Sequence, residues 1–329
     1  MHYTKLGRSG LSVSRLVLGT MNFGEHTDEA AAHRILDRAL EHGINVVDTA
    51  NMYGGTAGAG RTEEIIGRWF ALGGDRRERT VLATKVYGSM KGFGRTDNWP
   101  NTTRLSATNI RQACEASLRR LQTDHLDLYQ MHHIDRDTPF EEIWEAFSVL
   151  RQQGKVTYFG SSNFAGWHLV QAQEMASRLG MLGLVSEQSL YNLRSRTVEL
   201  EVLPAARAYG IGMIPWSPLA GGLLGGVLRK AREGRSAGPM TRKGLEQHRE
   251  QIQQWENLCG ELGEQPADVA LAWLLHQPGV TAPIIGPRTV QQLDASLRAI
   301  DISLTGDFLA RLDGIFPGPG GPAPEAFAW

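Results

Sequence analysis

Four side chains in this sequence, Asp48, Tyr53, Lys85 and His132, are of the types needed to bind and protonate a carbonyl group. A carbonyl that receives a hydride also needs a proton at its oxygen, and a tyrosine can supply one if a nearby cation lowers its pKa from about 10. Lys85 is the candidate cation, Asp48 the group that holds it charged, and His132 the group that orients the carbonyl. The set indicates carbonyl reduction.

Each of the four residues also has an ordinary structural interpretation. An aspartate at a strand end often caps a loop, and a tyrosine in a Gly-rich loop is often a surface aromatic. A lysine after a β-rich run is usually solvated, and one of two adjacent histidines is more often hydrogen-bonded than catalytic. Chemistry is favoured because all four stand at, or just after, the ends of predicted strands.

Short β-rich stretches alternate with amphipathic stretches along almost the whole chain. After a hairpin formed by Tyr3–Leu6 and Leu11–Val13, eight strands are predicted at Leu16–Leu18, Asn45–Asp48, Val81–Lys85, Leu126–Met131, Tyr158–Ser161, Leu184–Glu187, Gly212–Trp216 and Ala282–Ile285. Helices are predicted from periodic apolar residues at Asp28–Glu41, Glu63–Phe70, Ser106–Leu121, Phe140–Gln153, Ala165–Leu179, Val198–Tyr209, Pro266–His276 and Gln291–Ile300.

Eight β-then-α units predict an α/β protein, a (β/α)₈ TIM barrel over residues 1–315, with an N-terminal β-hairpin and a Pro/Gly-rich C-terminal tail over residues 316–329. An open doubly wound sheet is less economical because no Gly-rich dinucleotide turn follows the first strand. Three loops that follow strands, Gly54–Gly60, Gly88–Pro100 and Leu219–Glu246, are expected on the catalytic rim.

Composition favours small-molecule chemistry. With 34 Lys plus Arg against 35 Asp plus Glu, the net charge is -1, so no broad basic surface indicates nucleic acid or an anionic membrane as a partner. The 2 cysteines argue against a disulfide framework or a Cys-rich zinc site. Without an apolar signal segment or a membrane-length apolar run, the chain is expected to be cytoplasmic.

The local sequences around the four side chains resemble those of the aldo-keto reductase superfamily. Asp48–Gly54 resembles its Asp-to-Tyr signature, and Thr84–Lys85 and Met131–His132 resemble its lysine and histidine strands. The resemblance runs from about Tyr3 to Ile315. It implies a barrel enzyme in which the tyrosine is the general acid, the lysine and aspartate tune it, and the histidine places the carbonyl.

The resemblance also implies a site for a nicotinamide nucleotide. Ser162, Asn163 and Gln188 resemble the set that binds the carboxamide, and Trp216 resembles the aromatic residue on which the nicotinamide ring stacks. The structural alternative is that Trp216 fills the barrel mouth and that Ser162–Asn163 caps the next helix. The implied cofactor contacts are Gly19, Thr20, Met21, Ser162, Asn163, Gln188, Trp216, Ser217, Pro218, Leu219, Gly221, Leu223, Gly286, Arg288, Gln292 and Ser296.

Phosphate recognition is expected from backbone amides of Ser217–Leu223 and from Gly286–Thr289, because barrels commonly bind phosphate after strands seven and eight. The guanidinium of Arg288 suits a 2′-phosphate, which favours NADPH over NADH. Thr289 and Gln292 also fit a helix capping box, so Gln292 has a structural alternative. Ser296 replaces the Asn usual in the family, which leaves the adenine contacts open.

Trp216–Leu223 resembles a branch that includes potassium-channel β-subunits and bacterial reductases of keto sugars and polyketide-type ketones. This branch implies a homo-oligomer, a tetramer or octamer. The tail that ends at Phe327 and Trp329 is then a lid over its own or a neighbour's barrel mouth, or a disordered end. The predicted substrate pocket includes Phe23, Tyr87, Trp99 and His133, with Met21, Met90 and Phe93 nearby; solvated loop aromatics are the alternative.

The leading hypothesis is NADPH-dependent reduction of an aldehyde or ketone, with a bulky ketone of secondary metabolism as the substrate. The alternatives are general aldehyde detoxification and a nucleotide-sensing regulatory subunit with little turnover. A metal-dependent barrel hydrolase is disfavoured, because the sequence lacks a His-x-His pair and a carboxylate cluster with ligand spacing, and Lys85 would repel a cation. No metal is expected.

Overall fold

Eight parallel strands form one closed sheet in the computed structural model, which describes residues 1–92, 94–228 and 239–325. The order is β10-β3-β4-β5-β6-β7-β8-β9. The strands are β3 (Val17–Gly19), β4 (Val46–Asp48), β5 (Val81–Val86), β6 (Leu126–Met131), β7 (Val156–Ser162), β8 (Leu184–Gln188), β9 (Gly212–Met213) and β10 (Ile284–Ile285). The sheet closes where Thr281 N–H donates to the Met213 carbonyl at 2.8 Å and Ile284 N–H to the Pro215 carbonyl at 2.9 Å.

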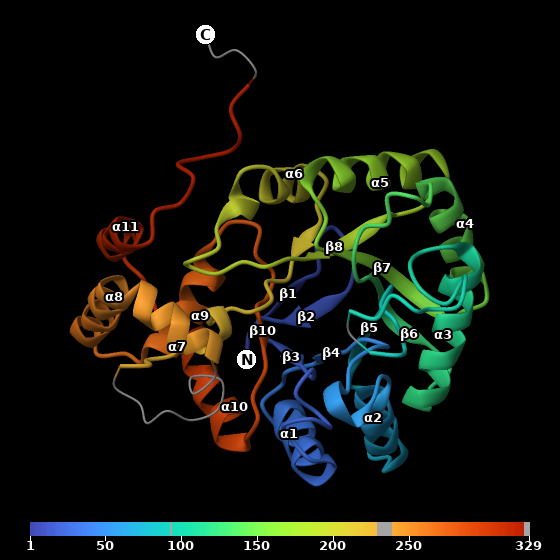
Figure 1. Ribbon diagram of the computed structural model, residues 1–329, viewed down its shortest axis with the longest axis horizontal. Helices are drawn as coiled ribbons and strands as arrows, with labels where there is room; N and C mark the ends of the chain where they lie inside the picture. Colours follow the sequence, from blue (N-terminus) through green and yellow to red (C-terminus); the bar gives the residue numbers. More distant parts are fainter. Residues whose placement is uncertain (93, 229–238, 326–329) are drawn as a thin grey trace.

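Helices surround this sheet (Figure 1). They are α1 (Glu29–Glu41), α2 (Arg61–Ala71), α3 (Ala107–Leu121), α4 (Phe140–Gln152), α5 (Gly166–Arg178), α6 (Val202–Ala208), α7 (Pro239–Gln247), α8 (Arg249–Leu262), α9 (Pro266–His276), α10 (Val290–Ser296) and α11 (Gly306–Ile315). α1 shows why they form: the Asp28 side chain accepts a hydrogen bond from Ala31 N–H, and Ile35, Leu36 and Ala39 are buried on one face. The predicted (β/α)₈ barrel is confirmed.

Strand register brings the ends of neighbouring strands to one rim. Lys85 lies opposite Gln130, and Ser162 lies opposite Gln188. Asp48 is the last residue of β4. Because parallel strands all end on the same side of a barrel, these side chains share its carboxyl end.

The helix predictions differ from the structure at four elements. α8 and α11 were not predicted, and α7 begins inside the stretch Leu219–Glu246, which was predicted as a loop. The predicted helix Val198–Tyr209 is divided, because a short 3₁₀ turn (η2, Thr197–Glu199) comes first and α6 begins two residues before Pro204. Proline is tolerated in the first helical turn but not in a helix interior, which accounts for this start.

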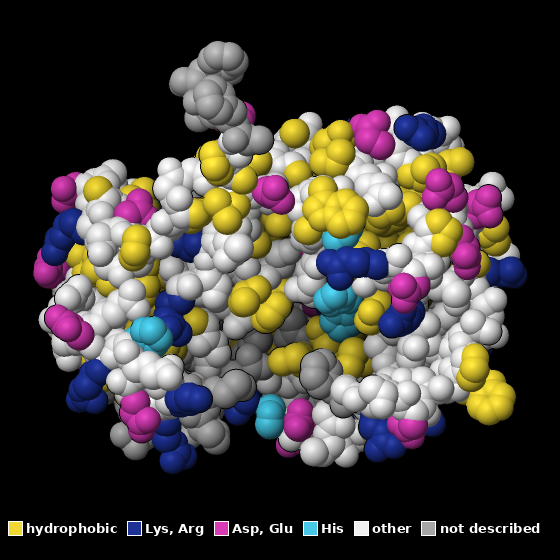
Figure 2. All heavy atoms as spheres, turned by 45° about the horizontal axis from the view of Figure 1, so that its top comes forward, with side chains coloured by type: hydrophobic (Ala, Val, Ile, Leu, Met, Phe, Trp, Pro, Cys, Tyr) yellow, Lys and Arg dark blue, Asp and Glu magenta, His cyan; other side chains and the backbone are white. Residues whose placement is uncertain are grey.

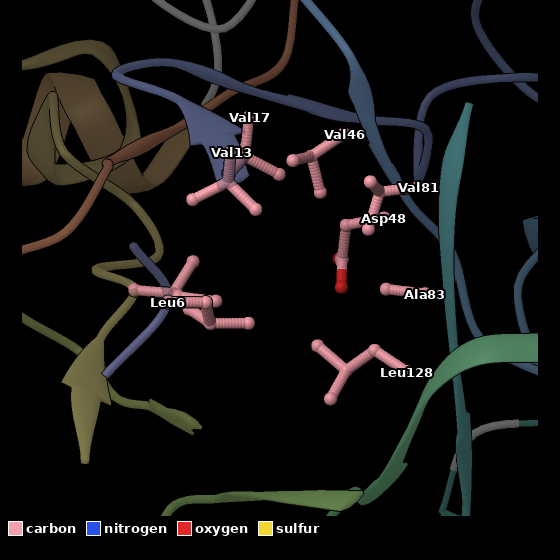
Figure 3. A pocket seen from close by; sticks show the side chains of 9 residues that line it. Leu6, Val13, Val17, Val46, Asp48, Val81, Ala83 and Leu128 are labelled. Atoms are coloured by element: carbon pink, nitrogen blue, oxygen red, sulfur yellow. The ribbon is translucent and has the colours of Figure 1, made fainter. Parts of the chain in front are cut away.

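The amino end of the barrel is plugged by the predicted hairpin, β1 (Tyr3–Lys5) and β2 (Ser12–Ser14). Leu6 and Val13 are buried in an apolar cluster with barrel residues such as Leu128. A cavity of about 10 Å³ remains between the hairpin and Asp48 (Figure 3). Its lining is Leu6, Val13, Val17, Val46, Asp48, Val81, Ala83, Leu128 and Ile214. This volume holds about one water, and an almost wholly apolar lining offers it few partners.

The chain leaves the barrel after α11. Phe316 is buried, with its ring 5.9 Å from the ring of Trp255. The following residues extend outward (Figure 1), and Ala323 N–H donates to the Leu200 carbonyl at 2.8 Å. The predicted lid residues Phe327 and Trp329 lie outside the described residues. No described helix is long and apolar enough to cross a membrane.

Candidate active site

The four predicted catalytic side chains lie together at the carboxyl rim. Lys85 is fully buried, and its Nζ donates to Asp48 Oδ2 at 2.6 Å, to the Thr49 carbonyl at 2.8 Å and to Tyr53 Oη at 3.4 Å. The ring of His132 is edge-on to that of Tyr53, with centroids 5.7 Å apart. The predicted proximity of the four is therefore present in the structure.

Two glutamine side chains hold Asp48 in place. Its Oδ1 accepts from Gln130 Nε2 at 3.1 Å and from Gln188 Nε2 at 2.9 Å. Gln130 was not predicted, although it is a polar residue among apolar neighbours on β6, two residues before His132, and this alternation is the signal that could have found it. The carboxylate is thus fixed from two strands while its other oxygen binds the lysine.

Burial and charge set the protonation states of this cluster. Burial lowers the pKa of Lys85, but Asp48 and Tyr53 together leave it raised, so the ammonium is charged. Burial raises the pKa of Tyr53, and Lys85 opposes this without reversing it. The prediction that the cation brings this pKa below its usual value is therefore wrong for this geometry. The phenol keeps its proton at neutral pH, as a proton donor must.

His132 is a neutral imidazole. Burial, assisted by Lys85 and His133, lowers its pKa to about 3. Its Nδ1 is buried and has no hydrogen-bond partner among the described residues. A neutral imidazole still carries one N–H, so the ring can donate to a carbonyl oxygen without bringing a charge into the site.

The predicted nicotinamide contacts form a connected group. Asn163 has a φ of 61°, and its Nδ2 donates to the His132 carbonyl at 3.2 Å and to Ser162 Oγ at 3.0 Å. Its Oδ1 accepts from Trp216 Nε1 at 3.1 Å, and Ser162 Oγ donates to the Gln188 carbonyl at 2.7 Å. The amide oxygen of Gln188 accepts no hydrogen bond within the described residues. That free acceptor suits the NH₂ of a carboxamide, so this group of residues fits a nicotinamide.

The loop after β9 folds into a tight, self-bonded turn. Ser217 and Gly221 have positive φ values of 54° and 68°, and Asn192 Nδ2 donates to the Ser217 carbonyl at 2.9 Å. Gly221 N–H donates to Ser217 Oγ at 3.2 Å, and Leu223 N–H to the Ala220 carbonyl at 3.3 Å. Asn192 was missed because its partner is distant in sequence.

This bonding pattern shows which backbone N–H groups of the loop are left for the predicted phosphate. The N–H groups of Ser217 and Leu219 have no acceptor in the described parts of the chain, whereas those of Gly221 and Leu223 are used within the loop. The side chain of Leu223 is buried in the core, and Pro218 has no N–H. Within this loop the amides of Ser217 and Leu219 suit an anion best, and the contacts predicted from Gly221 and Leu223 stay predictions.

At the start of α10 most predicted contacts have internal partners. Gln292 Oε1 accepts from Arg288 N–H at 2.8 Å, and Thr289 Oγ1 accepts from Gln292 N–H at 3.2 Å. Ser296 Oγ donates to the Gln292 carbonyl at 2.9 Å. Half of the predicted capping box is present, because the Thr289 side chain caps α10, whereas the Gln292 side chain binds Arg288 N–H and not Thr289 N–H. The guanidinium of Arg288 has no hydrogen-bond or ion-pair partner among the described residues, so it is free to receive a phosphate.

The remaining predicted cofactor contacts lie at the carboxyl ends of β3 and β10 or just after them. A Cβ on Gly19 would lie 2.4 Å from Ile284 Cγ2, so barrel packing alone requires this glycine. Thr20 Oγ1 donates to the Asp48 carbonyl at 2.9 Å, and the Gly286 carbonyl accepts from Asn22 Nδ2 at 2.9 Å. Met21 is 49% exposed at this rim.

One predicted pocket residue is wrong. Phe23 is fully buried in the hydrophobic core, because its loop turns back through a hydrogen bond from Phe23 N–H to the Thr20 carbonyl at 2.9 Å. Trp99 is 78% exposed, which fits the alternative of a solvated loop aromatic. Tyr87 and His133 do lie together, with ring centroids 5.4 Å apart. The predicted neighbour Phe93 lies outside the described residues.

Figure 2 shows one face of the molecule hollowed near its centre, with histidine and apolar side chains at the edge of the hollow. A concave site that combines apolar walls with a few polar groups is typical of small-molecule binding. Within residues 1–92, 94–228 and 239–325, no three His, Cys, Asp or Glu side chains are arranged to hold a metal ion.

Comparison with known proteins agrees with this geometry. Residues 15–316 match the family described as "Aldo/keto reductase family". The chain is 58% identical to the uncharacterized oxidoreductase YrpG of Bacillus subtilis (strain 168), with 100% of both chains covered. It is 32% identical to versiconal hemiacetal acetate reductase of Aspergillus parasiticus, covering 95% of this chain and 96% of that one. It is 33% identical to a probable voltage-gated potassium channel subunit beta of Arabidopsis thaliana, covering 92% of each. The chain therefore belongs to the aldo/keto reductase family of oxidoreductases.

Proposed function

We propose that this protein reduces an aldehyde or ketone to an alcohol with NADPH. The observation that carries the proposal is the buried chain of contacts from Asp48 to Lys85 at 2.6 Å and from Lys85 to Tyr53 Oη at 3.4 Å. When bound, the reduced nicotinamide supplies a hydride to the carbonyl carbon. The protein then has to protonate the carbonyl oxygen.

Tyr53 donates that proton. As negative charge develops on the substrate oxygen, the phenol gives up its proton and the resulting phenolate lies beside the Lys85 ammonium. Asp48 already holds this ammonium in place, so little rearrangement is needed when the charge moves. The N–H of neutral His132 orients the same oxygen.

The nucleotide is held by residues from four strand ends. Ser162, Asn163 and Gln188 bind the carboxamide, and the half-buried Trp216 stacks on the ring. The amides of Ser217 and Leu219 receive phosphate. The guanidinium of Arg288, which has no partner in the described part of the chain, receives the 2′-phosphate. This is the basis for proposing NADPH over NADH.

The proposed substrate is a bulky ketone of secondary metabolism, and general aldehyde detoxification is the alternative. Similarity to versiconal hemiacetal acetate reductase supports the first. Similarity to a potassium channel subunit supports a second candidate function, a nucleotide-sensing regulatory subunit with little turnover. A cytoplasmic homo-oligomer, a tetramer or octamer, remains part of the proposal.

Cofactor binding can be tested before a substrate is known, by titrating tryptophan fluorescence with NADPH and then NADH. We expect saturable quenching that favours NADPH and that Arg288→Ala weakens by about tenfold or more, the loss of one charge-assisted phosphate contact. Arg178→Ala, an exposed arginine at the far end of α5, is the matched control and should bind like wild type. Folded protein that binds neither nucleotide would overturn the proposal. Binding without reduction of any compound in a carbonyl panel would favour the regulatory subunit.

A further inference from the structure

Glu187, on β8 directly before Gln188, is a buried acid that the reaction described above does not use. Its side chain is fully buried, and its carboxylate accepts three hydrogen bonds. Oε1 accepts from Ser189 Oγ at 2.6 Å and from Phe164 N–H at 3.1 Å, and Oε2 accepts from the hydroxyl of Ser161. One carboxylate thus joins β7, the turn that follows it, and the segment after β8.

This carboxylate holds the turn that carries two proposed nicotinamide contacts. Ser161 and Phe164 are the residues on either side of Ser162–Asn163, and both are bonded to Glu187. Asn163 has a φ of 61°, a left-handed conformation that non-glycine residues adopt only when surrounding contacts support it. Holding both flanks supplies that support, and so fixes the direction of the Asn163 side chain toward His132 and Trp216.

Glu187 has no cationic partner among the described residues. Its neighbours on β7 and after β8 are the serine hydroxyls, and β9 contributes Gly212 and Met213. The titratable group that α5 adds near this turn is His168, whose ring centroid lies 6.0 Å from that of Phe164. Burial lowers the pKa of His168, which keeps it neutral. The carboxylate charge is therefore balanced by hydrogen bonds alone.

Both protonation states of Glu187 fit the structure. Burial raises its pKa to about 7, against the lowering effect of the Ser161 and Ser189 hydroxyls. If the acid is protonated, its own O–H can donate to Ser161 Oγ. The Ser161 hydroxyl then has a second acceptor, the Ser186 carbonyl at 3.5 Å. The charge can change without leaving a buried donor unpaired.

We propose that Glu187 is a positioning residue whose charge also sets the preference of this site between oxidised and reduced nicotinamide. The inference rests on the proposed function. The oxidised ring carries a positive charge and the reduced ring is neutral, so a buried carboxylate bonded to both flanks of Ser162–Asn163 favours the oxidised form. The ionised fraction of Glu187 grows as pH rises, and the relative affinity for NADP⁺ grows with it.

The test measures the dissociation constants of NADP⁺ and NADPH by tryptophan fluorescence at about pH 6, 7 and 8. Their ratio is the readout, because protonation of the 2′-phosphate affects both nucleotides alike and cancels. In wild type we expect the ratio to move toward NADP⁺ by about threefold to tenfold over this range, the effect of one partly screened charge. Glu187→Gln keeps the shape but not the charge, and should give a flat ratio that favours NADPH.

Two serine variants make the test independent of whether Glu187→Gln folds. Ser161→Ala removes a donor that stabilises the carboxylate, so the pH at which the ratio changes should rise. Ser189→Ala should shift it in the same direction. A flat ratio in wild type, or an unchanged pH dependence in folded Glu187→Gln, would overturn this inference while leaving the proposed function intact. Wild type that binds neither nucleotide would remove both.

Discussion

The two ends of the barrel are built from different kinds of side chain. The amino end is filled by Leu6, Val13 and other apolar residues around a small cavity. The carboxyl end holds a buried Lys85–Asp48 ion pair whose remaining acceptor is occupied by amide groups. Asp48 lies between them, because it lines the cavity with one part of its side chain and binds the lysine with another.

The amino end of the barrel therefore contributes mainly to stability, and the carboxyl end mainly to the reaction. Burial of an apolar plug stabilises the folded chain and requires no specific geometry beyond close packing. A buried ion pair gains little net stability, since desolvation opposes the Coulomb attraction, but it fixes the position and charge of the groups it contains. Substitutions at the amino end should therefore change the free energy of unfolding, and those at the carboxyl end should change the reaction.

The largest expected effect is on the reaction, in Tyr53→Phe. The substitution removes the proton donor and leaves the ring against Lys85 and His132, so reduction of a confirmed substrate should slow by about 10²-fold to 10⁴-fold while cofactor binding persists. Steady-state rates and NADPH titrations measure the two separately. Tyr209→Phe, which removes a hydroxyl bonded to Glu174 on the outer helices, is the matched control. A wild-type rate in folded Tyr53→Phe would assign the proton to another group.

At the amino-end plug, Leu6→Ala should lower stability and leave the reaction nearly unchanged. This side chain is 2% exposed and lines the cavity, so its truncation should enlarge the void and lower the free energy of unfolding by about 2 to 5 kcal/mol. Turnover per folded molecule should stay within about twofold of wild type. Leu72→Ala, at a residue that is 61% exposed, should change stability by less than about 0.5 kcal/mol. Denaturant unfolding with parallel rate measurements tests both, and a stable but inactive Leu6→Ala would show that the two ends are coupled.

The sequence was most informative where local pattern and function coincide. Asp48, Lys85 and His132 lie at or next to the carboxyl ends of β4, β5 and β6. β propensity and a functional residue therefore coincide in each run, so the fold and the proximity of these residues could be predicted. The nicotinamide contacts followed from the family resemblance, and the structure brings Ser162, Asn163 and Trp216 together.

The sequence was least informative where the contact is made across the fold. Gln130 and Asn192 hold Asp48 and Ser217 from other segments. Gln130 is marked only by its polarity among apolar neighbours on β6, and no local motif marks Asn192. Phe23 was predicted to line the substrate pocket, yet a backbone turn carries it into the core. The pKa of Tyr53 depends on burial as well as on Lys85, and burial cannot be read from residue type.

The smallest of these effects is a pH dependence of the unfolding free energy. It would measure how much keeping His132 neutral at the carboxyl end costs in stability at low pH. The pKa of His132 is lowered to about 3 in the folded chain, against about 6.5 when unfolded. Between these values the unfolded chain binds the extra proton, so folding stability falls as pH falls, by at most about 1.4 kcal/mol per pH unit from this group. His132→Gln removes this titration. Between about pH 7 and about pH 5, wild type should therefore lose more unfolding free energy than the variant does. Denaturant unfolding across this range measures it. A constant difference would mean that folding does not lower the pKa of His132, so that the folded site would begin to protonate this imidazole near its ordinary pKa of about 6.5.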